Sequence, residues 1–250
     1  MKDCYFVTDA HLGAGADSSQ RERELVAFLT SIEDKADTLF LLGDMFDFWF
    51  TYRHVVPRGH VRFLGQLARM VDRGIQVHFF IGNHDMWLFD YLSSEIGIIM
   101  HPHPETLHLQ GRTIHLGHGD GLDAHDHKYN FLKRVFRSPI NQRLFAAVHP
   151  GLSFGIANAW SHSSRVSHGP NCQDYKGDDR EGIVQHCLQL LHNEPYDYFV
   201  FGHRHGQVLR PLSTNGHNAT YINVGNWLNR RDYAVLHQGT ITLHQYQPNE

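Results

Sequence analysis

Residue types that bind metal ions recur along this chain, and each group directly follows a short apolar segment in the sequence. The residues are Asp9 and His11, Asp44 and Asp47, Asn83 with His84 and Asp85, His118, and His203 with His205. Carboxylate, imidazole and amide oxygen together suit Mn, Fe, Zn or similar divalent ions. Histidine is also frequent, with 22 residues against 22 for lysine and arginine combined, which favours metal chemistry.

The segments in front of these residues predict the strands that must position them. We expect strands over residues 5–7, 38–42, 75–81, 112–117 and 197–201. Helical spacing between the first three strands, with helix starts expected at Ser18 or Ser19 and at Pro57, predicts a β-α-β-α-β order. This order is typical of a parallel sheet with right-handed crossovers. Alternate residues of an extended segment point the same way, so Asp9 with His11, and His203 with His205, should each face one cleft.

The second half of the chain predicts a different organisation. Segments 106–110 and 112–117 flank Gly111 and are expected to form two adjacent antiparallel strands. Residues 121–180 contain no convincing strand, and helices are expected over 129–148, 154–165 and 183–191. Four short strands near 207–211, 219–224, 233–237 and 240–246 are expected to form a second sheet.

Composition narrows the class of protein. The 250 residues carry a formal charge of −4, so no basic field suggests a nucleic acid partner. Three cysteines, far apart, lack the spacing of a zinc site. No stretch approaches 18 consecutive apolar residues, and Met1 leads straight into a core-like strand rather than a signal peptide. We expect a cytoplasmic, reducing location.

Asp44 has a special position in this constellation. It follows the strand expected at 38–42, and a carboxylate has two oxygens that can bridge two ions. Seven ligating side chains are about right for two open coordination shells. Two ions roughly 3.5–4 Å apart can clamp a phosphoryl oxygen during in-line displacement. Any one of these histidines alone could equally be a surface or core residue, so the prediction depends on the whole set.

The motifs resemble those of the calcineurin-like metallophosphoesterases. That family has D-x-H, G-D-x-x-D, G-N-H-(D/E), a histidine and G-H-x-H, and every block stands here in this order. The blocks are Asp9 to His11, Gly43 to Asp47, Gly82 to Asp85, His118, and Gly202 to His205. The resemblance covers residues 3–120 and 197–227. It implies an α/β, four-layer αββα sandwich of two mixed β-sheets.

The resemblance also implies a role for each residue. One metal ion would take Asp9, His11, Asp44 and His205, and the other would take Asp44, Asn83, His118 and His203. Mn²⁺ is the expected ion, with Fe or Zn as alternatives. His84 would stabilise charge on phosphorus or protonate the leaving oxygen, with Asp85 orienting its ring. Asp47 would hold a ligand histidine by a hydrogen bond, although it could be a surface acid.

Within this superfamily the blocks look most like the UDP-2,3-diacylglucosamine diphosphatases of lipid A biosynthesis. Phe46 and Trp49 follow the Asp44 loop, and Tyr129 stands eleven residues past His118, as in that family. The enterobacterial members carry arginine at the position of His84. By resemblance, the substrate-contact candidates are Asn83, His84, Asp126, Tyr129 and Arg165.

A helical insertion at 121–180 is expected within a single domain spanning 1–250. Its helices interleave aromatic residues with six basic ones: Lys128, Lys133, Arg134, Arg137, Arg143 and Arg165. A basic amphipathic helix suits an anionic membrane surface or an amphiphilic anionic substrate. The alternative is an ordinary packed helical pair. We favour a lid that grips acyl chains, on a protein bound peripherally to the cytoplasmic face of the inner membrane.

The leading hypothesis is metal-dependent hydrolysis of the pyrophosphate of UDP-2,3-diacylglucosamine, an anionic glycolipid-nucleotide, without an obligate protein partner. The products would be UMP and 2,3-diacylglucosamine 1-phosphate. Two alternatives stay open. One is a calcineurin-like enzyme that acts on nucleotides, phosphoproteins or other phosphodiesters. The other is a protein-binding scaffold without catalysis, which could lose its ligands freely, whereas none is missing here.

Overall fold

The computed structural model describes residues 2–123, 126–156, 177 and 180–248. Among these residues, eleven strands and six helices are named. The strands are β1 (Asp3–Val7), β2 (Ala36–Leu41), β3 (Gln76–Phe80), β4 (Ile99–His101), β5 (Glu105–Leu109), β6 (Arg112–Gly117), β7 (Tyr198–Phe201), β8 (Val208–Thr214), β9 (His217–Asn223), β10 (Asp232–His237) and β11 (Thr240–Gln245). The helices are α1 (Ser18–Ile32), α2 (Val61–Asp72), α3 (Tyr91–Ile96), α4 (His127–Arg137), α5 (Pro139–Ala146) and α7 (Gly182–Asn193).

The strands form two mixed sheets. The six-stranded sheet has the order β11-β10-β1-β2-β3-β4, in which β1 to β4 pair in parallel and β10 pairs antiparallel with β1. The five-stranded sheet has the order β5-β6-β7-β9-β8, with β6, β7 and β9 parallel and an antiparallel strand at each edge. The predicted parallel β-α-β-α-β unit is confirmed.

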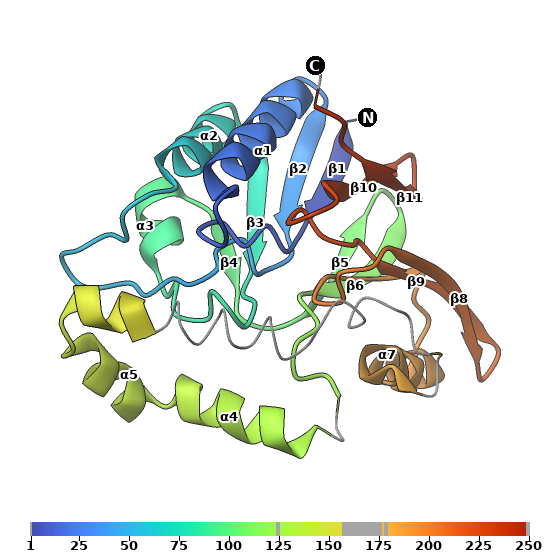
Figure 1. Ribbon diagram of the computed structural model, residues 1–250. Coiled ribbons are helices and arrows are strands. Elements are labelled where there is room, and N and C mark those ends of the chain that lie inside the picture. The colour runs from blue at the N-terminus through green and yellow to red at the C-terminus, as the bar shows by residue number, and fades with distance from the viewer. Residues whose placement is uncertain (1, 124–125, 157–176, 178–179, 249–250) are drawn as a thin grey trace.

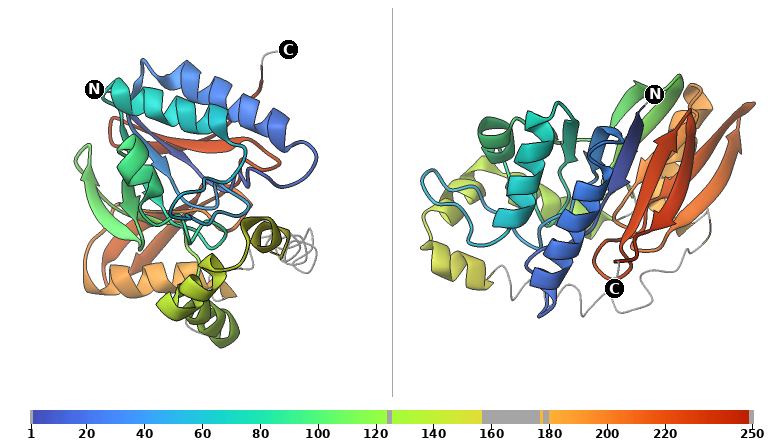
Figure 2. Two further views of the ribbon diagram at one scale, coloured as in Figure 1. Left: turned by 90° about the vertical axis from the view of Figure 1, so that its left-hand side faces the viewer. Right: turned by 90° about the horizontal axis from the view of Figure 1, so that it is seen from above.

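The two sheets pack face to face between helices, which gives the expected four layers (Figures 1 and 2). Phe6 and Phe40 of the first sheet meet Leu116 and Ile222 of the second in the apolar core between the sheets. A second core lies between α1, α2 and the outer face of the first sheet, and a third lies between α7 and the second sheet. The α/β sandwich expected from the motifs is therefore confirmed.

The expectation that the last four strands form one second sheet is wrong. Strands β8 and β9 join the five-stranded sheet, whereas β10 and β11 extend the six-stranded sheet beside β1. The alternation of apolar and polar residues fixes which face of a strand is buried, but it does not say which sheet the strand joins. The short elements α3 and β4 were not expected from the sequence.

Two helix predictions need correction. The helix expected from Pro57 begins at Val61, after His60 in a left-handed conformation with φ 59°. The single helix expected over 129–148 is two helices, α4 and α5, which meet at Ser138. Ser138 is extended, with ψ 122°, because the following Pro139 disfavours the helical conformation of the residue before it. Of the helix expected over 154–165, residues 154–156 are helical and 157–165 lie outside the described residues.

Helices α4 and α5 lie beyond the ends of β1, β2 and β3 in Figure 1, across the edge where the parallel strands terminate. None of the helices in the described part of the chain combines the length and apolar character needed to cross a lipid bilayer.

Candidate metal centre

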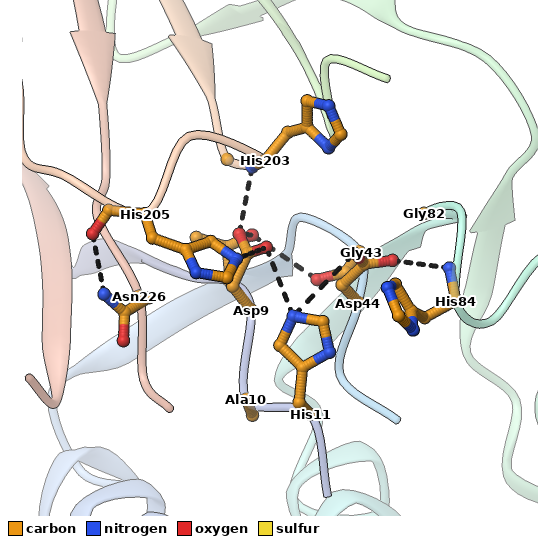
Figure 3. Close-up of polar contacts among 12 residues, drawn as sticks. Asp9, Ala10, His11, Gly43, Asp44, Gly82, His84, His203, His205 and Asn226 are labelled. Carbon is orange, nitrogen blue, oxygen red and sulfur yellow. Dashed lines mark hydrogen bonds and ion pairs between the residues drawn. The ribbon is translucent and has the colours of Figure 1, made fainter. Parts of the chain in front are cut away.

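The expected ligands lie in the loops that follow the parallel strands, and four of them have unusual backbone geometry. Asp9, His11, Asp44 and His203 all have positive φ, between 42° and 64°. A residue with a Cβ in this region costs about 1–3 kcal/mol, so such strain persists where the surroundings impose it, often at functional sites. Here it turns the chain sharply after each strand, and Figure 3 shows the side chains of Asp9, His11 and Asp44 directed toward one another.

The first group joins the beginning of the chain to its second half. The ligand atoms of Asp9, His11 and His205 lie within 4.8 Å of one another. Oδ2 of Asp9 accepts hydrogen bonds from the Thr8 hydroxyl at 2.6 Å and from the His203 backbone amide at 3.0 Å. Oδ1 of Asp9 faces Nε2 of His205 at 3.2 Å and Nε2 of His11 at 3.7 Å. One oxygen thus fixes the carboxylate and the other faces the two imidazoles.

The second group is built around Asp44. The ligand atoms of Asp44, His118 and His203 lie within 4.8 Å of one another. Oδ2 of Asp44 lies 3.3 Å from Nε2 of His118 and 3.9 Å from Nε2 of His11, so it faces both groups. The Asn83 amide oxygen lies 3.3 Å from the same His118 nitrogen. The structure therefore brings all seven expected ligands into one constellation, with Asp44 between its halves.

Two glycines make this approach possible. A Cβ on Gly43 would lie 2.7 Å from Nδ1 of His118, and φ there is +85°. A Cβ on Gly82 would overlap the carboxylate and backbone nitrogen of Asp44. The loops after β2 and β3 can lie this close only because both positions lack a side chain.

His118 is oriented for ligation by its other ring nitrogen. Nδ1 lies 2.8 Å from the Leu42 carbonyl oxygen and donates to it, which leaves Nε2 as the nitrogen that faces Asp44 and Asn83 and could bind an ion. Burial alone would lower the pKa of His118, but the Asp44 carboxylate raises it to about 10. Burial also opposes protonation of His11, yet Asp47, Asp9 and Asp44 raise its pKa to about 9. Both rings lie in a field that favours positive charge.

Buried atoms without hydrogen bonds test whether this constellation fits metal ions. Among the described residues, Oδ1 of Asp9 and both ring nitrogens of His11 are buried and make no hydrogen bond. Buried polar atoms are normally satisfied, so such a cluster needs a missing partner. A divalent cation among carboxylate, imidazole and amide ligands would supply one. The residues fit the metal ions that the motifs imply.

The expected pairing of His84 with Asp85 needs correction. Nδ1 of His84 lies 2.9 Å from the Asp47 backbone carbonyl and donates to it, so this contact orients the ring. The buried Asp85 carboxylate instead accepts from the amides of Gly82 at 2.8 Å and Met45 at 2.9 Å. It thereby ties the loop after β3 to the loop after β2. Burial and the nearby Asp44 charge raise the pKa of Asp85 to about 7.

Asp47 lies between two histidines. Its Oδ1 is 3.6 Å from Nδ1 of His11 and 3.8 Å from Nδ1 of His84. These are ion-pair distances rather than hydrogen bonds. The carboxylate is buried, so the sequence-based alternative of a surface acid is wrong.

The expected substrate contacts on the insertion have structural partners of their own. Oδ1 of Asp126 accepts from the backbone amide of Tyr129 at 2.9 Å and caps α4. The Tyr129 hydroxyl donates to Oδ2 of Asp120 at 2.9 Å, and Lys133 lies against the same carboxylate. Arg165 lies outside the described residues. Contacts of Asp126, Tyr129 and Arg165 with substrate stay predictions.

Several residues that hold the site were missed by the sequence analysis. Thr8 donates to Asp9, while the side-chain amides of Asn223 and Asn226 donate to the carbonyls of Gly202 and His205, on either side of the histidine loop. The Arg204 guanidinium binds both oxygens of the buried Glu181 carboxylate. Thr8 and Arg204 directly flank expected ligands, which could have drawn attention to them. The contacts themselves depend on how distant loops meet.

Two mixed sheets between helices, with carboxylates and histidines gathered at the strand ends, define the class of metal-dependent phosphoesterases. The family model for calcineurin-like phosphoesterases matches residues 4–207. The chain therefore belongs to this family and is a metal-dependent hydrolase, as the motifs predicted.

The chain is also similar to curated proteins along its length. It is 37% identical to a UDP-2,3-diacylglucosamine hydrolase of Porphyromonas gingivalis, with 98% of each chain covered. A protein of the same name from Edwardsiella ictaluri is 28% identical over 89% of this chain and 83% of its own. Among solved structures, a phosphoesterase from E. coli overlays with a TM-score of 0.46 at 14% identity, covering 96% of this chain and 91% of that one.

Proposed function

We propose that this protein hydrolyses the pyrophosphate bond of UDP-2,3-diacylglucosamine, giving UMP and 2,3-diacylglucosamine 1-phosphate, as a step of lipid A biosynthesis. The observation that carries the proposal is the 37% identity to the Porphyromonas gingivalis hydrolase across 98% of both chains. Coverage of this extent includes the insertion that holds α4 and α5 as well as the strand-end motifs. The similarity therefore extends over the part of the chain that we expect to choose the substrate, which supports assigning the same substrate class.

Two divalent ions, with Mn²⁺ as the expected metal, would act as Lewis acids on a phosphoryl oxygen and lower the pKa of the attacking water. In this proposal Asp9, His11, Asp44 and His205 hold one ion, and Asp44, Asn83, His118 and His203 hold the other. The position of Asp44 supports its bridging role, since its Oδ2 faces both His11 and His118. Thr8 and the His203 amide keep the Asp9 carboxylate turned toward the site.

His84 is the proposed catalytic side chain. Because Nδ1 donates to the Asp47 carbonyl, Nε2 is the ring atom that can contact a phosphoryl oxygen or hold a proton for the leaving oxygen. Burial lowers the pKa of His84, which favours the neutral ring with an unprotonated Nε2 before substrate binds. Donation to the leaving oxygen therefore requires that the ring first takes up a proton from water at Nε2, which the negative charge of a bound phosphate would favour. Asp85 supports the reaction by fixing the loop that carries Asn83 and His84.

The deciding experiment compares hydrolysis of UDP-2,3-diacylglucosamine with that of UDP-N-acetylglucosamine in the presence of Mn²⁺. We expect UMP release from the diacylated substrate and little from the compound without acyl chains. Equal rates would remove the claim of acyl recognition. No hydrolysis of the lipid by metal-loaded protein would overturn the proposed function.

We also propose peripheral association with the cytoplasmic face of an anionic membrane, through the tip of the insertion. Ile140 and Leu144, one turn apart on α5, expose 68% and 65% of their surface, and Leu152 exposes 65%. Arg143 lies between them in sequence, and apolar side chains beside basic ones are typical of interfacial helices. Sedimentation with anionic vesicles tests this proposal. Leu144→Glu should weaken binding, and equal sedimentation of variant and parent would contradict it.

A further inference from the structure

Helix α1 buries an arginine among its apolar residues. The buried side chains of this helix are Arg21, Leu25, Phe28, Leu29 and Ile32, so the arginine takes the first position of the stripe that packs on the six-stranded sheet. Arg21 exposes only 1% of its surface. A buried charge is costly unless its donors are bonded, so the contacts of this guanidinium must offset its desolvation.

The guanidinium bonds to the carbonyls of the loop that carries His11. Its Nε donates to the Ala10 carbonyl at 2.8 Å, and its Nη2 donates to the His11 carbonyl at 3.1 Å and to the Ala14 carbonyl. Its Nη1 donates to the Asp17 carboxylate at 2.9 Å, which supplies a negative charge beside it. Three carbonyls of one short loop therefore converge on one side chain of α1.

The amides of the same loop bond to the loop that carries Asp44. The His11 amide donates to the Asp44 carbonyl at 2.9 Å. The next amide, that of Leu12, donates to the Met45 carbonyl, also at 2.9 Å. The loop is thus held on its amide side by a neighbouring loop of the metal centre and on its carbonyl side by Arg21.

These bonds hold His11 in a backbone conformation that it would not adopt alone. Its φ is 42°, in the left-handed region that a residue with a Cβ avoids. In this conformation Nε2 of His11 lies 3.7 Å from Oδ1 of Asp9 and 3.9 Å from Oδ2 of Asp44. Ala10 and Ala14 are buried, so water could not simply replace the guanidinium at their carbonyls. Without Arg21 the loop would have to rearrange, and His11 would move with it.

We propose that Arg21 is a positioning residue for the metal ion that His11 would hold. It fixes the backbone on both sides of the His11 peptide and so keeps the imidazole directed at Asp9 and Asp44. An arginine suits this task because its rigid fork can donate in several fixed directions at once, whereas a lysine presents a single point charge. The proposal rests on the ligand set of the proposed function but not on the identity of the substrate.

The test is calorimetric titration of the full-length protein with Mn²⁺, after bound metal has been removed with a chelator. The variant Arg21→Met keeps an apolar stem and removes every donor. One ion should then bind at least about 10-fold more weakly than in the parent, as is typical when an outer partner of a metal ligand is lost. The loss should be confined to one of the two ions, since His11 belongs to one ligand set.

Arg69→Met is the matched control for stability. Arg69 of α2 bonds to the buried carboxylate of Glu33, which lies at the opposite end of α1 from Arg21. The same substitution there removes a contact of the same helix without touching the loop of His11. It should lower the unfolding temperature and leave both Mn²⁺ affinities unchanged. An equal loss of Mn²⁺ affinity in this control would overturn the proposal, because the effect would then be one of general stability.

A double-mutant cycle tests whether Arg21 acts through His11. His11→Ala removes the ligand itself, so the further change Arg21→Met should weaken Mn²⁺ binding little more, because changes that act through one group are not additive. Fully additive losses, or unchanged Mn²⁺ affinity in Arg21→Met alone, overturn the proposal. Circular dichroism verifies that each variant is folded. If Arg21→Met is not, Arg21→Lys takes its place, and a loss at the same ion is expected because an ammonium group cannot reproduce the fork.

Failure of this role can be distinguished from failure of the proposed function. A parent protein that binds Mn²⁺ and cleaves UDP-2,3-diacylglucosamine, with equal Mn²⁺ affinity in Arg21→Met, overturns the positioning role alone. A parent that binds Mn²⁺ but does not cleave this lipid overturns the proposed substrate. The titrations of Arg21→Met and Arg69→Met then still decide the role of Arg21.

Discussion

At the scale of single residues, the site depends on carboxylates in which one oxygen accepts local hydrogen bonds and the other faces the histidines. One oxygen of Asp9 accepts hydrogen bonds from the Thr8 hydroxyl and the His203 amide. One oxygen of Asp44 accepts a hydrogen bond from the His84 amide at 2.8 Å. In each case the second oxygen faces histidine nitrogens. The backbone bonds set the direction of the carboxylate, and the remaining oxygen is positioned before any ion binds.

Asp44→Asn tests the bridging role. The substitution keeps the shape of the side chain but removes its charge, so the two proposed ion sites lose their shared anionic ligand. We expect metal content to fall and activity to drop by at least about 100-fold, since even the loss of outer partners of metal sites costs about 10–100-fold. Metal analysis and a thermal unfolding curve check this, the latter because the fold should persist. Full activity in this variant would exclude a bridging Asp44.

Metal binding should depend on pH in a defined direction. Without bound ions, the pKa of His11 is raised to about 9 and that of His118 to about 10, against the opposing effect of burial. Both imidazoles are therefore protonated on both nitrogens at neutral pH. An ion must displace the proton on Nε2 in order to bind there. Affinity should rise as pH increases toward 9, with proton release on binding. Calorimetry in buffers of different ionisation enthalpy measures this, and affinity that is independent of pH would contradict it.

At the scale of elements, the sequence revealed the strands and loops of the site better than their partners. The apolar run before Gly43 and Asp44 marks a buried strand end, so the position of Asp44 could be predicted locally. The partners of Asp85 and Tyr129 could not, because they depend on how separate loops and α4 meet in space. Pro139 is a sequence signal for the break between α4 and α5. The helical spacing on both sides of it nevertheless suggested one continuous helix.

The contact between Tyr129 and Asp120 fastens α4 to the loop that carries His118. Tyr129→Phe removes the hydroxyl and leaves the buried Asp120 carboxylate with one fewer donor, at a cost of about 1–3 kcal/mol. We expect the amides of α4 to exchange hydrogen faster than in the parent protein. Hydrogen-exchange mass spectrometry measures this. Tyr198→Phe is the matched control, since its hydroxyl donates to the Gly239 carbonyl in the turn between β10 and β11 of the first sheet, away from α4. Equal protection of α4 in both variants would contradict the fastening role.

At the scale of the whole molecule, three apolar cores separate four layers, and the site occupies one edge of the central pair of sheets. The layers were predictable from the family motifs. The assignment of β10 and β11 to the first sheet was not, because an alternating strand fits either sheet.

The pairing of β1 with β10 also sets the order in which the molecule can form. The bond from the His203 amide to Asp9 spans 194 residues, and β1 gains its second neighbour only when β10 has been synthesised. Contacts so distant in sequence close late and make folding slow. A growing chain on the ribosome exposes Asp9 and His11 long before His203 and His205 exist. The complete constellation therefore arises only after translation has passed His205, and the pairing of β1 with β10 follows later still, so tight metal uptake would mark a nearly complete molecule.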